Sequence, residues 1–351
     1  MKPSASAEGP AVLVAQTSFL GDVVLTTPLL SALRRRARPR RLAVLVRPEA
    51  EPLLRGHPDV DQVLIDDKRG RDRGMSGLAH TARRLRREHF DVAVSPHRSL
   101  RTALVLTAAG IPRRIGFRES RGAFLYHERV RRDRRRHDVE RNLALAEPFG
   151  GETDTPNLHL PVSAEAARRA DALLPVGDGP VVGIAPGSVW ATKRWTPEGF
   201  ARVVQALAAD GARCMILGAD ADRELAQRIA NESGVDPLVL AGRTDLATLV
   251  AVIDRLSLLI ANDSAPMHVA CARGVPVVAV FCATTPELGY APYGSRATVV
   301  QADLDCRPCS RHGGHRCPRG TDDCMRLVEP DAVLAAARAA VGGRGGSGDA
   351  A

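Results

Sequence analysis

Short apolar runs that alternate with helical stretches are the feature that most restricts how this chain can fold. In the clearest case, the apolar run at 258–261 ends abruptly at Asn262, Asp263 and Ser264. A helical pattern begins there, and a second apolar run covers 275–281. Short unbroken apolar runs are typical of parallel strands that are buried on both faces. The segment therefore predicts a strand, a polar turn, a short helix and a second strand.

The polar turn of this segment is suited to two roles. A short side-chain oxygen of Asp263 or Ser264 can cap the helix by accepting a hydrogen bond from its first turn. The turn also offers free backbone N–H groups and the positive end of the helix dipole, which favour an anion such as a phosphate. Ligands of open parallel sheets usually bind at the carboxyl ends of strands. We therefore expect a ligand site at this turn, in addition to capping.

The same alternation recurs along the chain in two blocks. In the first block the pattern predicts strands at 11–16, 42–46, 60–65, 91–95 and 114–117, helices at 22–33, 77–87, 99–109 and 137–149, and an exposed basic loop at 129–136. In the second block it predicts helices at 163–174, 196–210, 220–233 and 245–255, and strands at 180–185, 214–218 and 238–241.

A polar stretch at 150–161, rich in Gly, Thr and Pro, separates the two blocks and predicts a linker. This organisation predicts an α/β fold with two Rossmann-like domains that face each other across a central cleft. The expected bounds are 11–160 for the first domain, 161–328 for the second and 329–341 for a final helix. The two ends, 1–10 and 342–351, are expected to be disordered.

Basic residues are concentrated in the first half of the chain. Residues 1–150 contain 30 Lys and Arg against 17 Asp and Glu, a net charge of +13, whereas residues 151–351 contain 19 against 23, a net charge of −4. A basic domain suggests an acidic partner, which could be nucleic acid, an anionic membrane surface or a phosphorylated acceptor. Aromatic residues make up only 3% of the chain, so there are few side chains on which bases could stack.

No apolar run reaches the roughly 18 residues that a membrane-spanning helix needs, and the first ten residues lack the apolar core of a signal peptide. We therefore expect a cytosolic protein, in which cysteines are thiols or metal ligands rather than disulfides. Four cysteines lie within 19 residues and resemble a zinc knuckle, although the second pair is not Cys-x2-Cys. The alternatives are free thiols that cover the second domain, or a disulfide formed only under oxidation. The four are Cys306, Cys309, Cys317 and Cys324, with His312 and His315 between them; Cys214, Cys271 and Cys282 are expected in the core.

A second candidate anion site follows the predicted strand at 180–185. Gly187 and Ser188 offer a tight turn with free N–H groups and a hydroxyl, and Lys193 and Arg194 add cations beside it. These features describe a phosphate cradle, although the Walker A pattern is absent. The alternative is a basic surface loop. Lys193 is one of only three lysines in a chain rich in arginine, which favours a specific role.

Two further residues have both a structural and a functional interpretation. His268 is five positions after Asp263, so the two could converge on one ligand, or His268 could be an ordinary helix residue. Asp22 follows Gly21 at the start of the first predicted helix, where a carboxylate ordinarily stabilises the helix dipole and its pKa should fall. The functional interpretation of Asp22 is a general base that faces the phosphate site from the first domain.

Together these motifs resemble glycosyltransferase family 9, the ADP-heptose:lipopolysaccharide heptosyltransferases. The resemblance covers nearly the whole chain, and the cysteine-rich block at 306–324 is similar to a segment of heptosyltransferase II-like members. The motifs that carry it are Gly-Asp-Val-Val-Leu-Thr-Thr-Pro at 21–28, Pro-Gly-Ser at 186–188, Thr-Lys-Arg-Trp at 192–195, Asn-Asp-Ser-Ala-Pro-Met-His at 262–268 and Gly-Tyr-Ala-Pro-Tyr at 289–293.

The resemblance implies a GT-B fold, with an N-terminal acceptor domain, a C-terminal nucleotide-sugar domain and a final helix that crosses back. It implies inverting, metal-independent transfer of heptose from ADP-heptose to the inner core of lipopolysaccharide, without a cofactor. It places the general base at Asp22 and acceptor contacts at Ser18 and Gly21. The donor contacts that it implies are Ser188 and Lys193 for the diphosphate, Asp222 for the ribose with Asp220 and Glu224 close by, and Asp263, Ser264, Met267 and His268 for the sugar and phosphates.

The basic first domain then fits an anionic lipopolysaccharide core, met by a cytoplasmic enzyme bound peripherally at the inner membrane. Three alternatives are a family 9 transferase with a different sugar or acceptor, a nucleotide-sugar epimerase and a basic nucleic-acid-binding protein. An epimerase needs no lipid acceptor, so the basic domain argues against it. The shortage of aromatic residues, and the phosphate cradle in the acidic domain, argue against nucleic acid.

Overall fold

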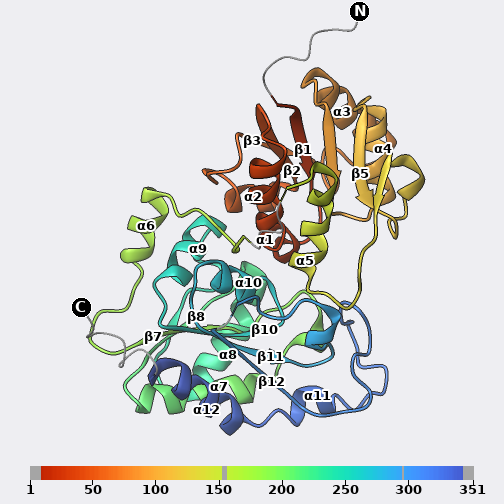
Figure 1. The fold of residues 1–351 in the computed structure, drawn as a ribbon. Coiled ribbons are helices and arrows are strands. Elements are labelled where there is room, and N and C mark those ends of the chain that lie inside the picture. The colour runs from red at the N-terminus through yellow and green to blue at the C-terminus, as the bar shows by residue number, and fades with distance from the viewer. Residues whose placement is uncertain (1–8, 152–155, 295, 343–351) are drawn as a thin grey trace, which may run out of the picture. The chain divides into compact units, whose positions relative to one another are not determined.

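The computed structural model describes residues 9–151, 156–294 and 296–342, and the chain divides into two compact units, Met1–Pro161 and Val162–Ala351. Within the described residues, each unit contains one six-stranded sheet with helices packed on it (Figure 1). All strand pairs are parallel. The predicted α/β class with two Rossmann-like units is therefore confirmed.

The sheet of the first unit has the strand order β3-β2-β1-β4-β5-β6. Its central strands are apolar and buried along nearly their whole length, as expected for parallel strands covered on both faces. The strands are β1 Ala11–Ala15, β2 Arg41–Val46, β3 Gln62–Ile65, β4 Val92–Ser95, β5 Arg113–Phe117 and β6 Glu128–Val130. The helices are α1 Leu20–Val24, α2 Thr27–Arg36, α3 Gly74–Arg87, α4 Leu100–Ala108 and α5 Asp138–Leu143, with 3-10 turns η1 Pro48–Leu53, η2 Ala123–Leu125 and η3 Ala144–Phe149.

The single helix predicted at 22–33 is wrong, because the chain forms the two helices α1 and α2 there. Pro28 lies in the first turn of α2, where a residue without a backbone N–H is tolerated but cannot continue a preceding helix. The hydroxyls of Thr26 and Thr27 donate to the carbonyls of Asp22 (2.7 Å) and Val24 (2.8 Å), which ends α1. As a result, Asp22 lies on a helix of its own.

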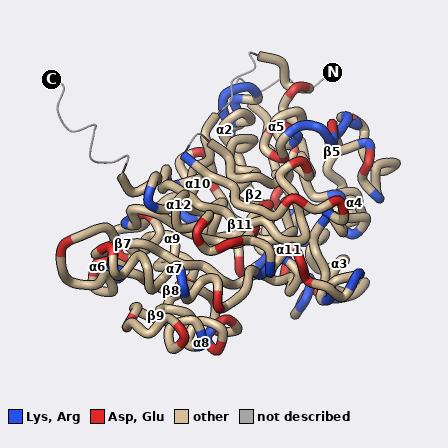
Figure 2. The backbone as a smooth tube through the Cα atoms, turned by 90° about the horizontal axis from the view of Figure 1, so that it is seen from below, with Lys and Arg blue, Asp and Glu red and all other residues tan. Residues whose placement is uncertain are grey.

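The exposed basic loop predicted at 129–136 is also partly wrong. Its start belongs to strand β6, and Arg132 is only 8% exposed because it forms an ion pair with the buried Asp138. The helix predicted at 137–149 is shorter than expected, since α5 is followed by the 3-10 turn η3. Figure 2 shows Lys and Arg of this unit at the ends of α2 and α3 and beside α5.

The sheet of the second unit has the order β12-β11-β10-β7-β8-β9. Its edge strand β12 had not been predicted, because only part of its sequence is apolar and none of its residues is fully buried. The strands are β7 Val181–Ala185, β8 Arg213–Ile216, β9 Leu238–Val239, β10 Leu258–Asn262, β11 Val277–Phe281 and β12 Ala297–Gln301. The helices are α6 Ala164–Asp171, α7 Pro197–Ala209, α8 Arg223–Ser233, α9 Leu246–Asp254, α10 Ala265–Ala272, α11 Asp323–Arg326 and α12 Pro330–Gly342, with 3-10 turns η4 Ala191–Lys193, η5 Asp220–Asp222 and η6 Pro286–Leu288.

The final helix α12 covers the range where a closing helix was expected, and its Val333 and Ala337 pack into the core of the second unit. Most of the two ends that were expected to be disordered, residues 1–8 and 343–351, lies outside the described residues. Over the described ranges, no helix combines the length and the apolar character that a membrane span requires.

The order of strands reverses at one place in each sheet, between β1 and β4 in the first unit and between β7 and β10 in the second. At such a point the loops that follow the two strands leave in opposite directions and open a crevice at the carboxyl edge, which is where ligands of doubly wound sheets bind. The loops after these four strands are therefore the first places to look for functional side chains.

Candidate functional site

One buried amide fixes the geometry at the reversal point of the second unit. Asn262, the last residue of β10, donates from Nδ2 to the carbonyl of Pro186 at 2.7 Å. Its Oδ1 accepts from the backbone N–H of Trp195 at 3.0 Å. Pro186 and Trp195 are the two ends of the loop that contains the predicted phosphate cradle. A single side chain with both a donor and an acceptor therefore holds this loop against the neighbouring strand.

Lys193 and Asp263 meet at this edge of the sheet. The Nζ of Lys193 lies 2.6 Å from Oδ2 of Asp263, and the side chains are 14% and 6% exposed. The hydroxyl of Thr284, which follows β11, donates to the same carboxylate oxygen at 2.6 Å. An ammonium has three donors, so the ion pair with Asp263 leaves it able to contact a bound anion. The structure thus brings together two residues that the sequence had placed in separate motifs.

Arg194 has a different role from the neighbouring lysine. Its guanidinium donates from Nε (2.8 Å) and from an Nη (2.6 Å) to the carbonyl of Ser188. This bidentate contact closes the loop on itself and fixes the backbone of Ser188. The sequence had grouped Arg194 with Lys193 as cations beside a phosphate cradle. In the structure the guanidinium of Arg194 shapes the loop, and the ammonium of Lys193 lies at the strand edge.

The predicted side-chain cap of α10 is wrong. Ser264 is the N-cap residue, but neither it nor Asp263 makes a capping hydrogen bond among the described residues. The Oγ of Ser264 is buried and has no hydrogen-bond partner within the described chain. A buried hydroxyl without a partner costs about 1–3 kcal/mol. Pro266 has no N–H and the N–H of Met267 donates to the carbonyl of Ser264 at 3.2 Å, so the start of α10 lacks a side-chain cap and lies beside an unpaired hydroxyl and the Lys193–Asp263 pair.

Met267 and His268 lie further along α10 and are almost fully buried, at 0% and 4% exposure. Met267 is therefore a core residue of the second unit, and His268 is packed inside it. Both Asp263 and His268 lie within one turn of the start of α10, and their convergence on one ligand stays a prediction.

Asp222 lies against the cradle loop. Its Oδ2 accepts from the backbone N–H of Ala219 at 3.0 Å. A Cβ added at Gly187 would lie 2.5 Å from the same oxygen, so the carboxylate is packed directly on the backbone of the loop after β7. Gly187 is required here for close approach rather than for an unusual backbone angle. Of the three acidic residues considered for the ribose, Asp222 is the one that contacts this loop.

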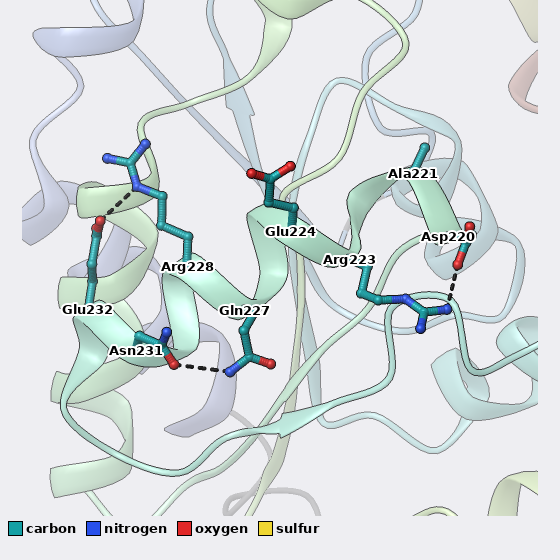
Figure 3. A pocket seen from close by; sticks show the side chains of 8 residues that line it. All are labelled: Asp220, Ala221, Arg223, Glu224, Gln227, Arg228, Asn231 and Glu232. Atoms are coloured by element: carbon teal, nitrogen blue, oxygen red, sulfur yellow. Dashed lines mark hydrogen bonds and ion pairs between the residues drawn. The ribbon is translucent and has the colours of Figure 1, made fainter.

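The other two acidic residues, Asp220 and Glu224, line a surface hollow of about 980 Å³ along α8 (Figure 3). Side chains in this hollow pair with one another: Gln227 donates to Asn231 at 3.0 Å, and Arg228 donates to Glu232 at 2.7 Å. Its lining residues all come from η5 and α8, so the hollow is separate from the loops after β7 and β10.

The cysteine-rich segment at 306–324 does not fit a zinc site. In the described part of the chain, no three His, Cys, Asp or Glu side chains are arranged so that they could hold a metal ion. All four cysteines of the segment are free thiols. Of the cysteines expected in the core, Cys214 and Cys282 are buried and Cys271 is half-buried. The alternative in which free thiols cover the second unit is the one that the structure favours.

The same segment is docked onto the lysine loop. The carbonyl of Gly314 accepts from the backbone N–H of Thr192 (3.0 Å) and from its hydroxyl (3.1 Å), and the N–H of Gly314 donates to that hydroxyl at 2.8 Å. A Cβ at Gly313, which has a φ of +81°, would lie 3.0 Å from Cγ of Lys193. The segment therefore forms one wall around the aliphatic part of Lys193.

Arg307 ties the segment to the end of β11. Its Nη2 donates to the carbonyls of Phe281 (2.9 Å) and Thr284 (2.7 Å). Thr284 is the residue whose hydroxyl bonds Asp263. A path of hydrogen bonds thus runs from Arg307 to the Lys193–Asp263 pair. Sequence reasoning missed Thr284 and Arg307. The available signal for Thr284 was its position just after an apolar strand, and for Arg307 its position inside the cysteine-rich segment.

In the first unit, Asp22 accepts two hydrogen bonds at Oδ2, from the hydroxyl of Ser18 (2.7 Å) and from the backbone N–H of Phe19 (3.2 Å). Burial, and next the negative charge of Asp138, raise the pKa of Asp22 to about 6, although these hydrogen bonds and Arg132 oppose the shift. The predicted fall of this pKa is therefore wrong. Helix α1 has only five residues, so its dipole is weak, and the sequence did not reveal the burial.

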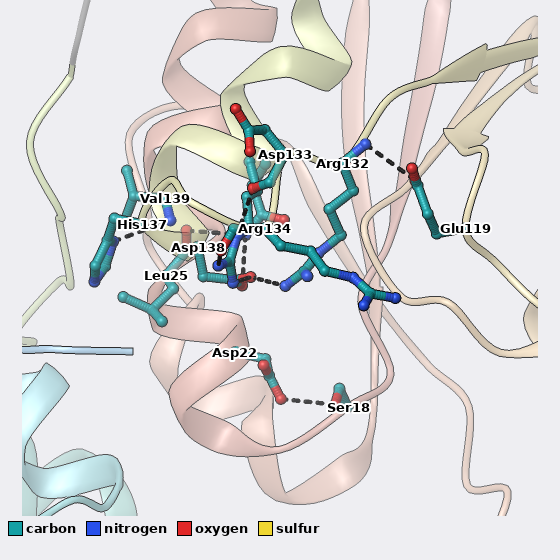
Figure 4. Close-up of polar contacts among 12 residues, drawn as sticks. Ser18, Asp22, Leu25, Glu119, Arg132, Asp133, Arg134, His137, Asp138 and Val139 are labelled. Carbon is teal, nitrogen blue, oxygen red and sulfur yellow. Dashed lines mark hydrogen bonds and ion pairs between the residues drawn. The ribbon is translucent and has the colours of Figure 1, made fainter. Parts of the chain in front are cut away.

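Asp22 lies below a buried cluster of charges (Figure 4). Asp138, at the start of α5, pairs with Arg132 and with Arg141 at 3.5 Å. Asn142 donates to Asp138 at 3.4 Å and to the carbonyl of Leu25 at 3.3 Å. Gly21, the other residue predicted on this side, is in α1 and its carbonyl accepts from the N–H of Leu25 at 2.9 Å. The structure therefore brings Ser18, Gly21 and Asp22 together in one short helix and its approach.

A second polar cluster occupies the reversal point of the first sheet. The hydroxyl of Thr17 lies 3.0 Å from Nδ1 of His97 and accepts from Nζ of Lys68 at 3.3 Å. Burial and nearby cations lower the pKa of Lys68 to about 8 and that of His97 to about 3. The cations that lower the pKa of Lys68 are Arg47, Arg101 and Arg69, and Asp66 acts in the opposite direction. For His97 the cations are Lys68, Arg98 and Arg47.

This excess of positive charge marks a place where an anionic ligand would be favoured. Sequence reasoning missed the cluster. The available signal was that Thr17 and His97 follow the two apolar strands β1 and β4, and that Lys68 is one of only three lysines in the chain.

Comparison with known proteins adds three findings. The family model described as glycosyltransferase family 9 (heptosyltransferase) matches residues 78–316. A lipooligosaccharide heptosyltransferase 2 of Haemophilus influenzae is 26% identical over 306 residues, which cover 83% of this chain and 88% of that protein. Two solved structures resemble the fold: a glycosyl transferase family 9 protein of Veillonella parvula (TM-score 0.85, 26% identity, 96% of this chain and 98% of that chain) and the E. coli ADP-heptose lps heptosyltransferase II (TM-score 0.80, 24% identity, 95% and 99%). These likenesses confirm the predicted GT-B fold.

Proposed function

The chain belongs to glycosyltransferase family 9 (heptosyltransferase), and on this premise we propose that it transfers L-glycero-D-manno-heptose from ADP-heptose to the inner core of lipopolysaccharide. The H. influenzae relative is a lipooligosaccharide heptosyltransferase 2 and the E. coli structure is an ADP-heptose lps heptosyltransferase II, which supports this reaction. The matched region includes the loops of Ser188, Lys193 and Asp263. Within the family, we propose that this chain is heptosyltransferase II-like.

The observation that carries the proposal is the position of Lys193. Its ammonium is held by Asp263 beside the uncapped start of α10 and the unpaired hydroxyl of Ser264. In glycosyl transfer, negative charge grows on the departing diphosphate while the sugar becomes oxocarbenium-like. A fixed cation and backbone N–H groups stabilise that charge without a metal ion. Lys193 and the first turn of α10 are therefore proposed to hold the ADP diphosphate.

The remaining donor contacts follow from the same loops. Ser188, whose backbone is fixed by Arg194, is proposed to bond a phosphate through its hydroxyl or N–H. Asp222, packed against Gly187, is proposed to accept from the ribose hydroxyls. Asp263 is proposed to accept a hydrogen bond from the sugar at its Oδ1. The buried Met267 and His268 are proposed to pack beneath this site.

Asp22 is proposed as the general base. It would take the proton from the acceptor hydroxyl as the oxygen attacks the anomeric carbon, which is a single displacement and inverts the configuration. A carboxylate with a pKa of about 6 is ionised at neutral pH and is more basic than an ordinary aspartate. The hydrogen bond from Ser18 fixes the orientation of the carboxylate.

The acceptor is proposed to be an anionic core oligosaccharide, met at the cytoplasmic face of the inner membrane by a peripherally bound enzyme. The +13 charge of residues 1–150 supports this class of partner. Within the unit, Lys68 and the cations around it supply a place for a phosphate or carboxylate of the acceptor. Ser18 and Gly21 lie next to Asp22 and are proposed to contact the reacting end of the acceptor.

The test is an assay of ADP-heptose consumption by the purified protein with a panel of defined core acceptors. Heptose transfer to a heptosylated inner core, and loss of transfer in Asp22→Asn, is the expected result. Transfer to a different acceptor, or from another ADP-linked sugar, would redirect the proposal to a different member of the family. No transfer with any acceptor would overturn it.

A further inference from the structure

A buried ion pair in the first unit has no part in the donor or acceptor contacts described above. Arg132 is 8% exposed and Asp138 is 5% exposed, and the two are paired through Nη2 and Oδ1. Arg141, which is 2% exposed, adds a second cation to the same carboxylate oxygen at 3.5 Å. Burying an ion pair is rarely favourable for stability alone, since desolvation offsets most of the attraction. Stability alone therefore does not account for the Arg132–Asp138 pair.

The pair is attached to the helix of Asp22. Asn142, one turn after Asp138 in α5, donates to the carbonyl of Leu25 directly after α1. The next residue, Thr26, donates its hydroxyl to the carbonyl of Asp22 at 2.7 Å. Figure 4 shows Asp138 and Arg132 above Asp22, whose carboxylate is turned toward Ser18. Among the largest influences on the pKa of Asp22, the charged groups are Asp138 from α5 and Arg132 from the segment after β6.

We propose that Arg132 and Asp138 are positioning residues that together set the acidity at which Asp22 can accept the proton of the acceptor hydroxyl. The inference rests on the proposed role of Asp22 as the base. Neither residue touches the reacting atoms in this account. Each acts on Asp22 through its charge and through the packing of α5 against α1.

The two charges oppose each other at Asp22. The carboxylate of Asp138 disfavours a second negative charge nearby and so raises the pKa of Asp22, whereas the guanidinium of Arg132 lowers it. Without Asp138, Asp22 would be ionised but weakly basic. Without Arg132, only Arg141 would still pair with the carboxylate of Asp138, and the pKa of Asp22 would rise. The pair thus balances basicity against ionisation, which is what a general base near neutral pH requires.

Removing Asp138 and removing Arg132 should shift the pKa of Asp22 in opposite directions, which a purely structural role of the pair would not produce. The dependence of kcat on pH, measured at saturating donor and acceptor, has an acid limb that follows the ionisation of Asp22. Asp138→Asn should move the midpoint of this limb down by about one pH unit, and Arg132→Gln should move it up by a smaller amount. Arg132→Lys keeps the charge and should return the midpoint towards that of the wild type.

Arg135→Gln is the matched control. It removes the same charge three residues from Arg132, but Arg135 is exposed and is not among the groups with the largest effect on Asp22. Its midpoint should equal that of the wild type. Midpoints that do not move in Asp138→Asn and Arg132→Gln, or that move in the same direction, would overturn the inference.

A second readout does not depend on activity. In protein labelled with ¹³C at the Asp carboxyls, the signal of Asp22 is assigned by its absence in Asp22→Asn and is titrated in each folded variant. The same opposite shifts are expected. Should Asp22→Asn retain full transfer, the proposed base is wrong while this titration still decides whether the pair controls Asp22. Should the titration show no shift while Asp22→Asn is inactive, the base stands and the inference fails.

Discussion

Lys193 and Asp263 form an ion pair at the carboxyl ends of β7 and β10, with 2.6 Å between Nζ and Oδ2. Both side chains are largely buried, and taking two charges out of water costs free energy that their attraction only partly returns. The contribution of the pair to the stability of the unit is therefore small. In the proposed role its effect is on position, because an incoming diphosphate would meet a cation whose side chain is already ordered.

Replacing this lysine should weaken binding of the nucleotide. In Lys193→Met the aliphatic packing against Gly313 is kept and the charge is lost, so we expect the Kd for ADP to rise about 10- to 100-fold, in line with the loss of a charge-assisted hydrogen bond. Isothermal titration calorimetry measures this directly. Lys68→Met is the matched control, since it removes the same group from the other unit, and an equal loss of ADP affinity there would contradict the assignment.

A methyl group at Gly187 should disturb the nucleotide site without touching a ligand. The added Cβ would lie 2.5 Å from the Asp222 carboxylate, so Gly187→Ala must displace that side chain. If Asp222 holds the ribose, both Gly187→Ala and Asp222→Ala should weaken ADP by about tenfold and leave the affinity for inorganic pyrophosphate unchanged. Gly314→Ala, where the nearest atom would be 3.5 Å from the new Cβ, provides the sterically mild comparison. Loss of pyrophosphate affinity in Asp222→Ala would instead place Asp222 on the phosphates.

The charged carboxylate of Asp22 should lower the free energy of unfolding at neutral pH, although transfer requires it. Its folded pKa of about 6 lies above the ordinary 3.8, so its favourable contribution to folding is fully present below pH 3.8 and is lost as the pH rises through about 6. Asp22→Asn should therefore abolish transfer and yet raise the free energy of unfolding at pH 7.5 by about 1 kcal/mol. Urea denaturation at pH 7.5 and pH 4.5 checks this, with the gain smaller at pH 4.5. A variant less stable than the wild type at both pH values would refute the burial of a charged Asp22.

Deprotonation of Lys68 should weaken acceptor binding at alkaline pH. Burial and neighbouring cations lower its pKa to about 8, so the ammonium loses its proton as the pH rises through that value and can no longer attract an anion. We expect the KM for an anionic acceptor to rise above pH 8 while the KM for the donor stays level. In Lys68→Arg the cation persists to much higher pH, so this rise should disappear. A rise that is unchanged in Lys68→Arg would assign it to another group.

Removal of metal should have no effect on the cysteine-rich segment. The four thiols do not form a site for a metal ion in the described chain, and the segment is held by Thr192, Gly314 and Arg307 instead. Protein purified without added zinc should contain less than one zinc ion per ten chains by elemental analysis, on the order expected for incidental binding. Dialysis against EDTA should leave ADP affinity and the thermal midpoint unchanged. Stoichiometric zinc, or loss of stability on chelation, would restore the zinc knuckle.

The predictions from sequence that succeeded rest on local pattern. Buried strands such as β1 and β10 are visible as apolar runs, and the order of strands and helices follows from their alternation. What failed depended on contacts between distant residues. Arg132 looks like one of many surface arginines until α5 places Asp138 beside it, and Ser264 looks like a cap until its hydroxyl is found unpaired.

The candidate site shows the same division. The residues of the Lys193 and Asp263 motifs were identified from their sequence context, but the ion pair between them could not be, because it depends on β7 and β10 being neighbours in the sheet. The pKa of Asp22 was predicted in the wrong direction for a similar reason. A helix start can be recognised locally, whereas burial and the charge of Asp138 come from residues more than a hundred positions away.

The docking of Gly314 on Thr192 also has a consequence for the order in which the protein matures on the ribosome. The two residues are 122 positions apart, and the hydroxyl of Thr192 gains its partner only after the chain has been synthesised past Gly314. Strands β7 to β12 are complete before then, so the sheet can assemble while the lysine loop still lacks its outer wall. The wall around Lys193, at the proposed nucleotide site, therefore forms only after residue 314 has been synthesised.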